Sequence, residues 1–190
     1  MRACKLTILA LGLALGFGDG AHADDYWVPP IGGTCGPDSA TIRAGVYETA
    51  GFGVRFSGAS IGKIRLLCPL NLTSDVGPFS GMRMSFIDAD GMEAGGRIRA
   101  HLRRAAVGTN IWIAIGTCDS NTSDTTAAHV IFCPFDHYQS NNSEWYWWDV
   151  EIERTTPSVN VEFLGVEVRY QAAELRPSGR PRNPSGRQRR

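Results

Sequence analysis

The stretch Glu144-Trp-Tyr-Trp-Trp-Asp-Val-Glu-Ile-Glu153 decides the fold expected for this chain of 190 residues. Large apolar side chains alternate here with carboxylates, and such a period of two is typical of a β-strand with one buried face. The residues expected to face the core are Tyr146, Trp148, Val150 and Ile152, and those expected to face outward are Trp145, Trp147, Asp149, Glu151 and Glu153.

The same alternation recurs along the chain, and Gly and Pro separate the runs. Apolar side chains expected on one face of each strand are Phe52, Val54 and Phe56; Ile64 and Leu66; Met82, Met84 and Phe86; Ile98, Ala100 and Leu102; Ile111, Ile113 and Ile115; and Val130 and Phe132. The last run changes parity at Gly165, which predicts a β-bulge there. No helical stripe is evident, so we expect an all-β antiparallel sandwich, jelly-roll-like, with about eight strands.

The first 23 residues combine a basic start, a short apolar run and Ala21-His22-Ala23. This pattern is typical of a secretory signal peptide, so a single domain is expected over residues 24–175 in a secreted or periplasmic protein. Cleavage removes Cys4 and leaves Cys35, Cys68, Cys118 and Cys133, which allow three disulfide pairings. We favour Cys35–Cys68 and Cys118–Cys133 because each joins neighbours in the sequence. No later stretch is long and apolar enough to suggest a transmembrane segment.

The net charge of zero hides an asymmetry between the body and the end of the chain. Residues 24–175 contain 18 acidic and 11 basic residues, whereas residues 176–190 contain six arginines and no acid. With no apolar residue to bury, this Arg/Pro-rich tail is expected to be disordered. It is either a solvated tail or a basic arm that contacts anionic surfaces.

Trp145 and Trp147 lie two residues apart on the outward face of their predicted strand. Exposed aromatic rings at this spacing suit stacking on sugar rings or contact with another protein. Trp112 and Trp27 are expected to extend that surface. The alternative is that a loop, with Tyr26-Trp27-Val28 as the candidate, covers the rings.

Asp88, Asp90 and Glu93 surround a glycine turn and form a candidate Ca²⁺ site, because calcium prefers several oxygen ligands. The later ligands of an EF-hand do not follow, and the alternative is an acidic hairpin turn. Asp119-Ser-Asn121-Thr-Ser-Asp124 is a second acidic loop with the same two interpretations.

Two stripes of opposite charge have matching spacing: Arg97, Arg99, His101 and Arg103, and Asp149, Glu151 and Glu153. If their strands are neighbours, the stripes are expected to pair with each other; otherwise the basic stripe is a candidate anion site. Gly58-Ala-Ser-Ile-Gly62 matches the G-x-S-x-G pattern of serine hydrolases, but that motif needs a strand–turn–helix context. A strand is expected after Ser60, so we interpret the motif as a turn.

Four short segments carry a resemblance: Leu67-Cys-Pro-Leu70, Phe86–Gly91, Asp119-Ser-Asn121 and Phe163-Leu-Gly-Val166. Together they resemble a loose group of uncharacterised exported bacterial β-sandwich proteins. The resemblance implies export and a sandwich fold, and it carries no activity.

The sequence thus predicts a non-enzymatic exported binding domain, with a polysaccharide as the first ligand class. The alternative is a structural or adhesive protein of the cell envelope that engages other protein chains. An enzyme is the least favoured class, because no catalytic group of residues can be assembled from the motifs.

Overall fold

The computed structural model describes residues 25–28, 35–51, 53–70, 72, 76–139 and 143–172, with only the backbone for 25–28, 76–77 and 171–172. The predicted signal peptide and the Arg/Pro-rich tail lie outside these residues. Among the described residues, no helix is long and apolar enough to span a membrane.

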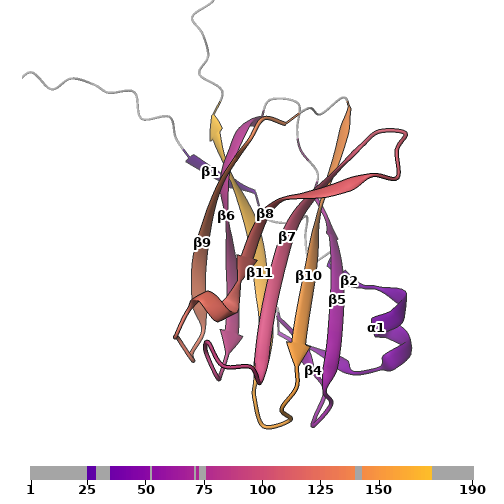
Figure 1. Ribbon diagram of the computed structural model, residues 1–190, viewed down its shortest axis with the longest axis vertical. Coiled ribbons are helices and arrows are strands. Elements are labelled where there is room, and N and C mark those ends of the chain that lie inside the picture. Colours follow the sequence, from indigo (N-terminus) through magenta and orange to yellow (C-terminus); the bar gives the residue numbers. More distant parts are fainter. Residues whose placement is uncertain are drawn as a thin grey trace, which may run out of the picture.

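The described chain is built almost entirely of β-strands (Figure 1). In chain order the elements are β1 (Asp25–Val28), β2 (Gly36–Pro37), α1 (Ser39–Ala44), β3 (Tyr47–Ala50), β4 (Gly53–Phe56), β5 (Gly62–Pro69), β6 (Val76–Asp88), β7 (Gly96–Ala106), β8 (Trp112–Asp119), the 3-10 turn η1 (Ser120–Thr122), β9 (His129–His137), β10 (Glu144–Arg154) and β11 (Val161–Ala172).

The strands form two sheets in which all described pairings are antiparallel. The first sheet has the order β3-β4-β11-β6-β9, and β1 also pairs with β11. The second sheet has the order β2-β5-β10-β7-β8. The all-β prediction is confirmed, and several short strands that the pattern did not predict raise the number of strands in the described residues to eleven.

One buried apolar cluster contains side chains from both sheets. Met82, Met84 and Phe86 of β6 contribute from the first sheet, and Trp148, Val150 and Ile152 of β10 contribute from the second. The alternation predicted for these strands therefore selects the buried face correctly. The predicted bulge is also present, because the register of β11 against β6 shifts between Phe163 and Gly165.

The predicted inward face of β9 is wrong, and the face predicted for the β8 segment holds only at Ile115, which packs against the core. Ile111 and Ile113 are exposed, and so are Val130 and Phe132 of β9. The inward face of β9 is instead made by Ile131, Cys133 and Phe135. Both strands are sheet edges, and Cys133 points inward because it bonds to Cys118 of the other sheet.

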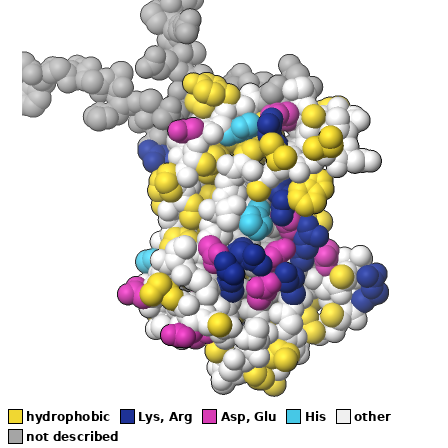
Figure 2. Space-filling view, viewed as in Figure 1, with side chains coloured by type: hydrophobic (Ala, Val, Ile, Leu, Met, Phe, Trp, Pro, Cys, Tyr) yellow, Lys and Arg dark blue, Asp and Glu magenta, His cyan; other side chains and the backbone are white. Residues whose placement is uncertain are grey.

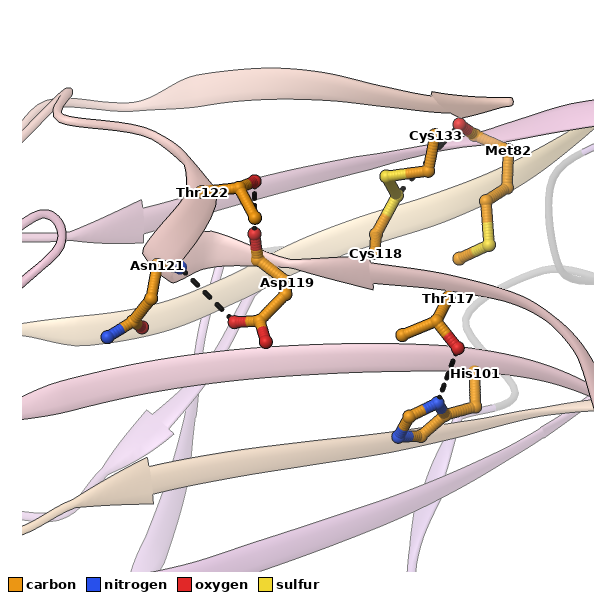
Figure 3. Close-up of a disulfide and its surroundings, with 8 residues drawn as sticks. All are labelled: Met82, His101, Thr117, Cys118, Asp119, Asn121, Thr122 and Cys133. Carbon is orange, nitrogen blue, oxygen red and sulfur yellow. Dashed lines mark hydrogen bonds between the residues drawn. A yellow bond between two sulfur atoms is a disulfide. The ribbon is translucent and has the colours of Figure 1, made fainter. Parts of the chain in front are cut away.

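Both favoured disulfides are present. Cys35 and Cys68 are joined with their Cα atoms 4.1 Å apart, and Cys118 and Cys133 with theirs 5.6 Å apart. The second bridge links β8 to β9, and thus the edge of one sheet to the edge of the other (Figure 3). It therefore holds the two sheets together along one side of the molecule.

The short helix α1 was not predicted. Asp38 caps its start by accepting a hydrogen bond from the Thr41 amide at 2.8 Å, and Gly45 ends it in a left-handed conformation. Both residues favour helix ends. Six residues are too few to show an amphipathic stripe, so only these two caps signal the helix in the sequence.

Candidate functional site

The outward face of β10 changes character along the strand. Trp145 is 69% exposed and Trp147 is partly exposed, whereas Asp149, Glu151 and Glu153 follow on the same face. The prediction that the two tryptophans face away from the core is therefore confirmed. Figure 2 shows the same change, with hydrophobic side chains toward the upper right and intermixed Lys, Arg, Asp and Glu side chains below them.

Strand register extends the tryptophans into a wider surface. Trp145 of β10 pairs with Ala105 of β7, and Ala105 pairs with Trp112 of β8. In the next row, Trp147 pairs with Pro69 of β5 and Arg103 of β7. We call Trp112, Trp145, Trp147, Ala105, Pro69 and Leu67 the aromatic face.

The aromatic face contains an apolar groove of about 560 Å³. Its lining comes from the end of β5 with Leu67 and Pro69, from the end of β7 and the following turn with Ala105 and Thr109, and from β10 with Trp145 and Trp147. Thr109 brings a hydroxyl group to this lining, and that hydroxyl donates to the Ala106 carbonyl at 2.9 Å. The groove therefore suits the apolar surface of a ligand.

The alternative in which residues 26–28 cover these rings does not fit the strand pairing. Residues 26–28 belong to β1, which pairs with β11 in the first sheet, whereas Trp145 and Trp147 lie on the outer face of the second sheet. The side chain of Trp27 lies outside the described part, so its predicted contribution stays a prediction. Trp112, by contrast, is 51% exposed and lies in the same row as Trp145.

Below the aromatic face, the two charged stripes pair with each other as predicted. β10 and β7 are neighbours, with Glu151 opposite Arg99 and Glu153 opposite Arg97. Arg99 lies 2.9 Å from Glu151 and 3.2 Å from Glu153. Lys63 of β5 adds a contact of 2.8 Å with Glu153. These contacts engage the stripes structurally and leave the anion-site interpretation without support.

Asp149 connects the charged stripes to the aromatic face. Its carboxylate is fully buried, and it accepts from Arg65 Nε at 2.7 Å and from Arg103 Nε at 2.6 Å. Burial alone would raise the pKa of Asp149, but the hydrogen bonds from the two arginines outweigh it and hold the pKa below its usual value. Arg103 in turn lies 4.3 Å from the centre of the Trp112 ring, a cation–π contact.

Two hydrogen-bonding side chains lie beside the aromatic face. His101 follows Arg103 on the same face of β7, and its Nδ1 lies 2.9 Å from the Thr117 hydroxyl (Figure 3). Burial lowers the pKa of His101, and the positive charge of Arg103 lowers it further. The imidazole is therefore neutral at neutral pH, and with Nδ1 engaged by Thr117 its Nε2 remains as the second hydrogen-bonding atom.

A second histidine lies behind the groove. His137 Nε2 is 3.0 Å from the hydroxyl of Tyr146, which also donates to Glu144. Glu144 is in turn paired with Arg104. Tyr146 belongs to the groove lining, its side chain is buried and its hydroxyl is fixed in this network, so the network stabilises the part of β10 that borders the groove.

The structure brings together two of the three predicted calcium ligands. Asp88 and Asp90 lie close enough that Asp90 adds to the effect of burial and raises the pKa of Asp88 to about 6. Glu93 is exposed, and the described residues contain no group of three or more Asp, Glu, His or Cys side chains that could hold a metal. The predicted three-carboxylate site is therefore not formed.

The remaining motifs occupy structural positions. Ser60 of the G-x-S-x-G segment lies in the turn between β4 and β5, where its carbonyl accepts from Arg154 Nε at 2.6 Å. In the second acidic loop, Asp119 accepts from Arg97 Nε at 3.0 Å. It also accepts from the Asn121 amide at 3.2 Å (Figure 3). These contacts support the turn interpretations.

Sequence reasoning missed Leu67, Pro69 and Ala105, which complete the aromatic face. Leu67 and Ala105 are ordinary strand residues and Pro69 is the last residue of β5, so none of them signals a site, and their role depends on which strands are neighbours. The equal spacing of the two charged stripes was the available signal, because it aligns β7 with β10 and thereby places Ala105 beside Trp145.

Comparison with known proteins adds no identity to this site: no family model matches the chain, and no curated protein matches its sequence.

Proposed function

We propose that this chain is an exported, non-enzymatic binding domain that uses its aromatic face to bind a polysaccharide. The observation that carries the proposal is the position of Trp145, which is 69% exposed, borders the apolar groove and shares its row with Trp112. Flat indole faces suit ligands with a flat apolar surface.

The surroundings of the aromatic face favour a sugar over a purely apolar ligand. A sugar ring has apolar C–H faces and hydroxyl groups around its edge. The tryptophans offer flat surfaces for the C–H faces. Arg103, His101 and Thr117 lie beside the tryptophans as hydrogen-bonding partners for the hydroxyl groups. A purely apolar ligand would leave these polar groups without new partners.

Two disulfides support the proposal that the chain is exported, because such bonds persist mainly in oxidising compartments. The leader-like pattern of residues 1–23 and the resemblance to exported β-sandwich proteins support it too. We further propose that the two sheets form a jelly-roll-like sandwich, since their buried side chains share one core.

Calorimetric titration tests the proposed function, with hydroxyethyl cellulose, xylan, galactomannan and glycol chitin as probes. Wild-type protein should bind at least one of them, and Trp145→Ala should weaken that binding about tenfold, or about 1.4 kcal/mol. Tyr138→Ala is the matched control, because Tyr138 is an exposed aromatic residue outside the groove lining. Binding to none of the four probes, or equal binding by both variants, contradicts the proposal.

A second candidate function is a structural or adhesive protein of the cell envelope. It is favoured by two exposed residues, Ile113 of the edge strand β8 and Ile111 directly before that strand. Sedimentation velocity distinguishes the two: concentration-dependent self-association that Ile113→Ser abolishes, without any polysaccharide binding, supports this second function.

A further inference from the structure

Three neighbouring strands place two exposed tryptophans on either side of a small residue beside the groove, and we call the space between the two tryptophans the trough. Trp145 on β10 and Trp112 on β8 are separated by Ala105 on β7, and all three belong to one row. Adjacent strands lie about 4.8 Å apart, so the two tryptophan attachment points are about 10 Å apart. The small, partly buried Ala105 forms the floor between them.

The dimensions of this trough fit one flat ring. Carbon atoms in contact lie about 3.5–4.0 Å apart, so a ring between two walls needs about 7–8 Å. The spacing of about 10 Å between the two attachment points exceeds this width. A larger residue at position 105 would occupy the space.

The trough is continuous with the groove. Trp145 and Ala105 belong to both: they line the groove together with Trp147, and they lie in one row with Trp112. A ligand that occupies both positions must cross β10, β7 and β8 roughly at right angles to the strands. It must therefore contain at least two linked rings.

Arg103 holds the far wall of the trough in position. Its guanidinium lies 4.3 Å from the Trp112 ring centre, while its Nε donates to the buried Asp149 at 2.6 Å. The Asp149 carboxylate also forms an ion pair with Arg65, whose Nε lies 2.7 Å from the carboxylate. Trp112 is thus supported by a side chain that is itself fixed.

From this arrangement we propose that the protein binds a polysaccharide chain across its strands through two subsites, one at Trp145 and Trp147 and one at Ala105 between Trp145 and Trp112. The inference rests on the proposed function and deepens it. The ligand is a linear chain rather than a single sugar, and Ala105 sets the access of the chain to the second subsite. His101 and Arg103 meet the hydroxyl edge of the chain along the lower side of the trough.

The test measures affinity against chain length. Oligosaccharides of one to six units, prepared from whichever polysaccharide binds in the calorimetric panel, are titrated into the protein by calorimetry. In the wild type we expect the dissociation constant to fall at least tenfold between the single sugar and the longer oligomers. Ala105→Leu should abolish this gain, because the larger side chain fills the space between Trp145 and Trp112.

Ala89→Leu is the matched control for added bulk, since Ala89 is exposed in the β6–β7 turn at the opposite end of β7. Trp112→Ala is the second variant and should lose the length dependence in the same way. Unfolding temperatures establish that each variant is folded.

The outcomes separate this inference from the proposed function. If no polysaccharide binds, both fail together. If the wild type binds the single sugar as tightly as the longer oligomers, or if both Ala105→Leu and Trp112→Ala retain the length dependence, the second subsite is wrong while the binding function stands.

Discussion

Replacing Asp149 with Ala should cause a large loss of stability for a residue on the outer face of a sheet. Asp149 is fully buried and pairs with both Arg65 and Arg103. Removing one partner of a buried ion pair costs about 3–5 kcal/mol. The side chains of Arg65 and Arg103 are 38% and 14% exposed, so water restores part of their solvation and we expect a net cost of about 2–3 kcal/mol.

Urea unfolding followed by circular dichroism measures this cost. In a domain of this size each kcal/mol corresponds to about 2–4 °C in Tm, so Asp149→Ala should also lower Tm by about 5–10 °C. The matched control is Glu153→Ala, which removes a carboxylate that is 29% exposed from the same strand. Its pairs with Lys63 and Arg99 are surface pairs, for which about 0–1 kcal/mol is typical.

The pH dependence has a defined sign. Folding lowers the pKa of Asp149 below its unfolded value of 3.8. The ionised carboxylate therefore stabilises the folded protein at pH values above 3.8, and this stabilisation is lost as the pH falls through the lower pKa of the folded state. The difference between wild type and Asp149→Ala should therefore be constant from pH 5 to 7 and shrink in stronger acid. An Asp149→Ala variant no less stable than Glu153→Ala would refute this reasoning.

Two further perturbations test other parts of the structure. Replacing both Cys118 and Cys133 with Ser should destabilise the protein by about 3 kcal/mol, the value expected for a loop of about 15 residues. Calorimetric unfolding of the wild type and the double variant measures this loss. An unchanged Tm would contradict the role assigned to the bridge. Folding raises the pKa of Asp88 from 3.8 to about 6. The protonated carboxyl therefore stabilises the folded protein fully at pH values below 3.8, and this stabilisation is lost as the pH rises through about 6. Asp88→Asn should remove this pH dependence between pH 4 and 7, with Asp136→Asn as an exposed control, and a pH profile like that of the wild type would count against it.

The central strands were predictable because their alternation is strict. In β10 every second residue from Tyr146 to Ile152 is large and apolar, and only one register buries all of them. The edge strand β9 has apolar residues on both faces, so its alternation was ambiguous. The bond from Cys133 to Cys118 decides which face turns inward, and that depends on contact between sheets that local patterning does not contain.

The candidate site was predictable in part for a similar reason. The exposure of Trp145 and Trp147 follows from parity within one strand. Ala105 and Pro69 join them only through the order of strands in the sheet, which local periodicity leaves open. The predicted calcium ligands show the converse limit, since Asp88 and Asp90 approach each other but the turn directs Glu93 into solvent.

The most direct test of the account is an NMR titration of the indole N–H groups with the polysaccharide that binds in the calorimetric panel. Trp112, Trp145 and Trp147 lie on the aromatic face, whereas Trp148 is fully buried one residue away and serves as an internal control. Assignments come from single Trp→Phe variants. We expect the signals of Trp112, Trp145 and Trp147 to shift with a common dissociation constant while the Trp148 signal stays in place. Unchanged signals from the three face tryptophans in the presence of saturating polysaccharide would contradict the aromatic face as the binding site.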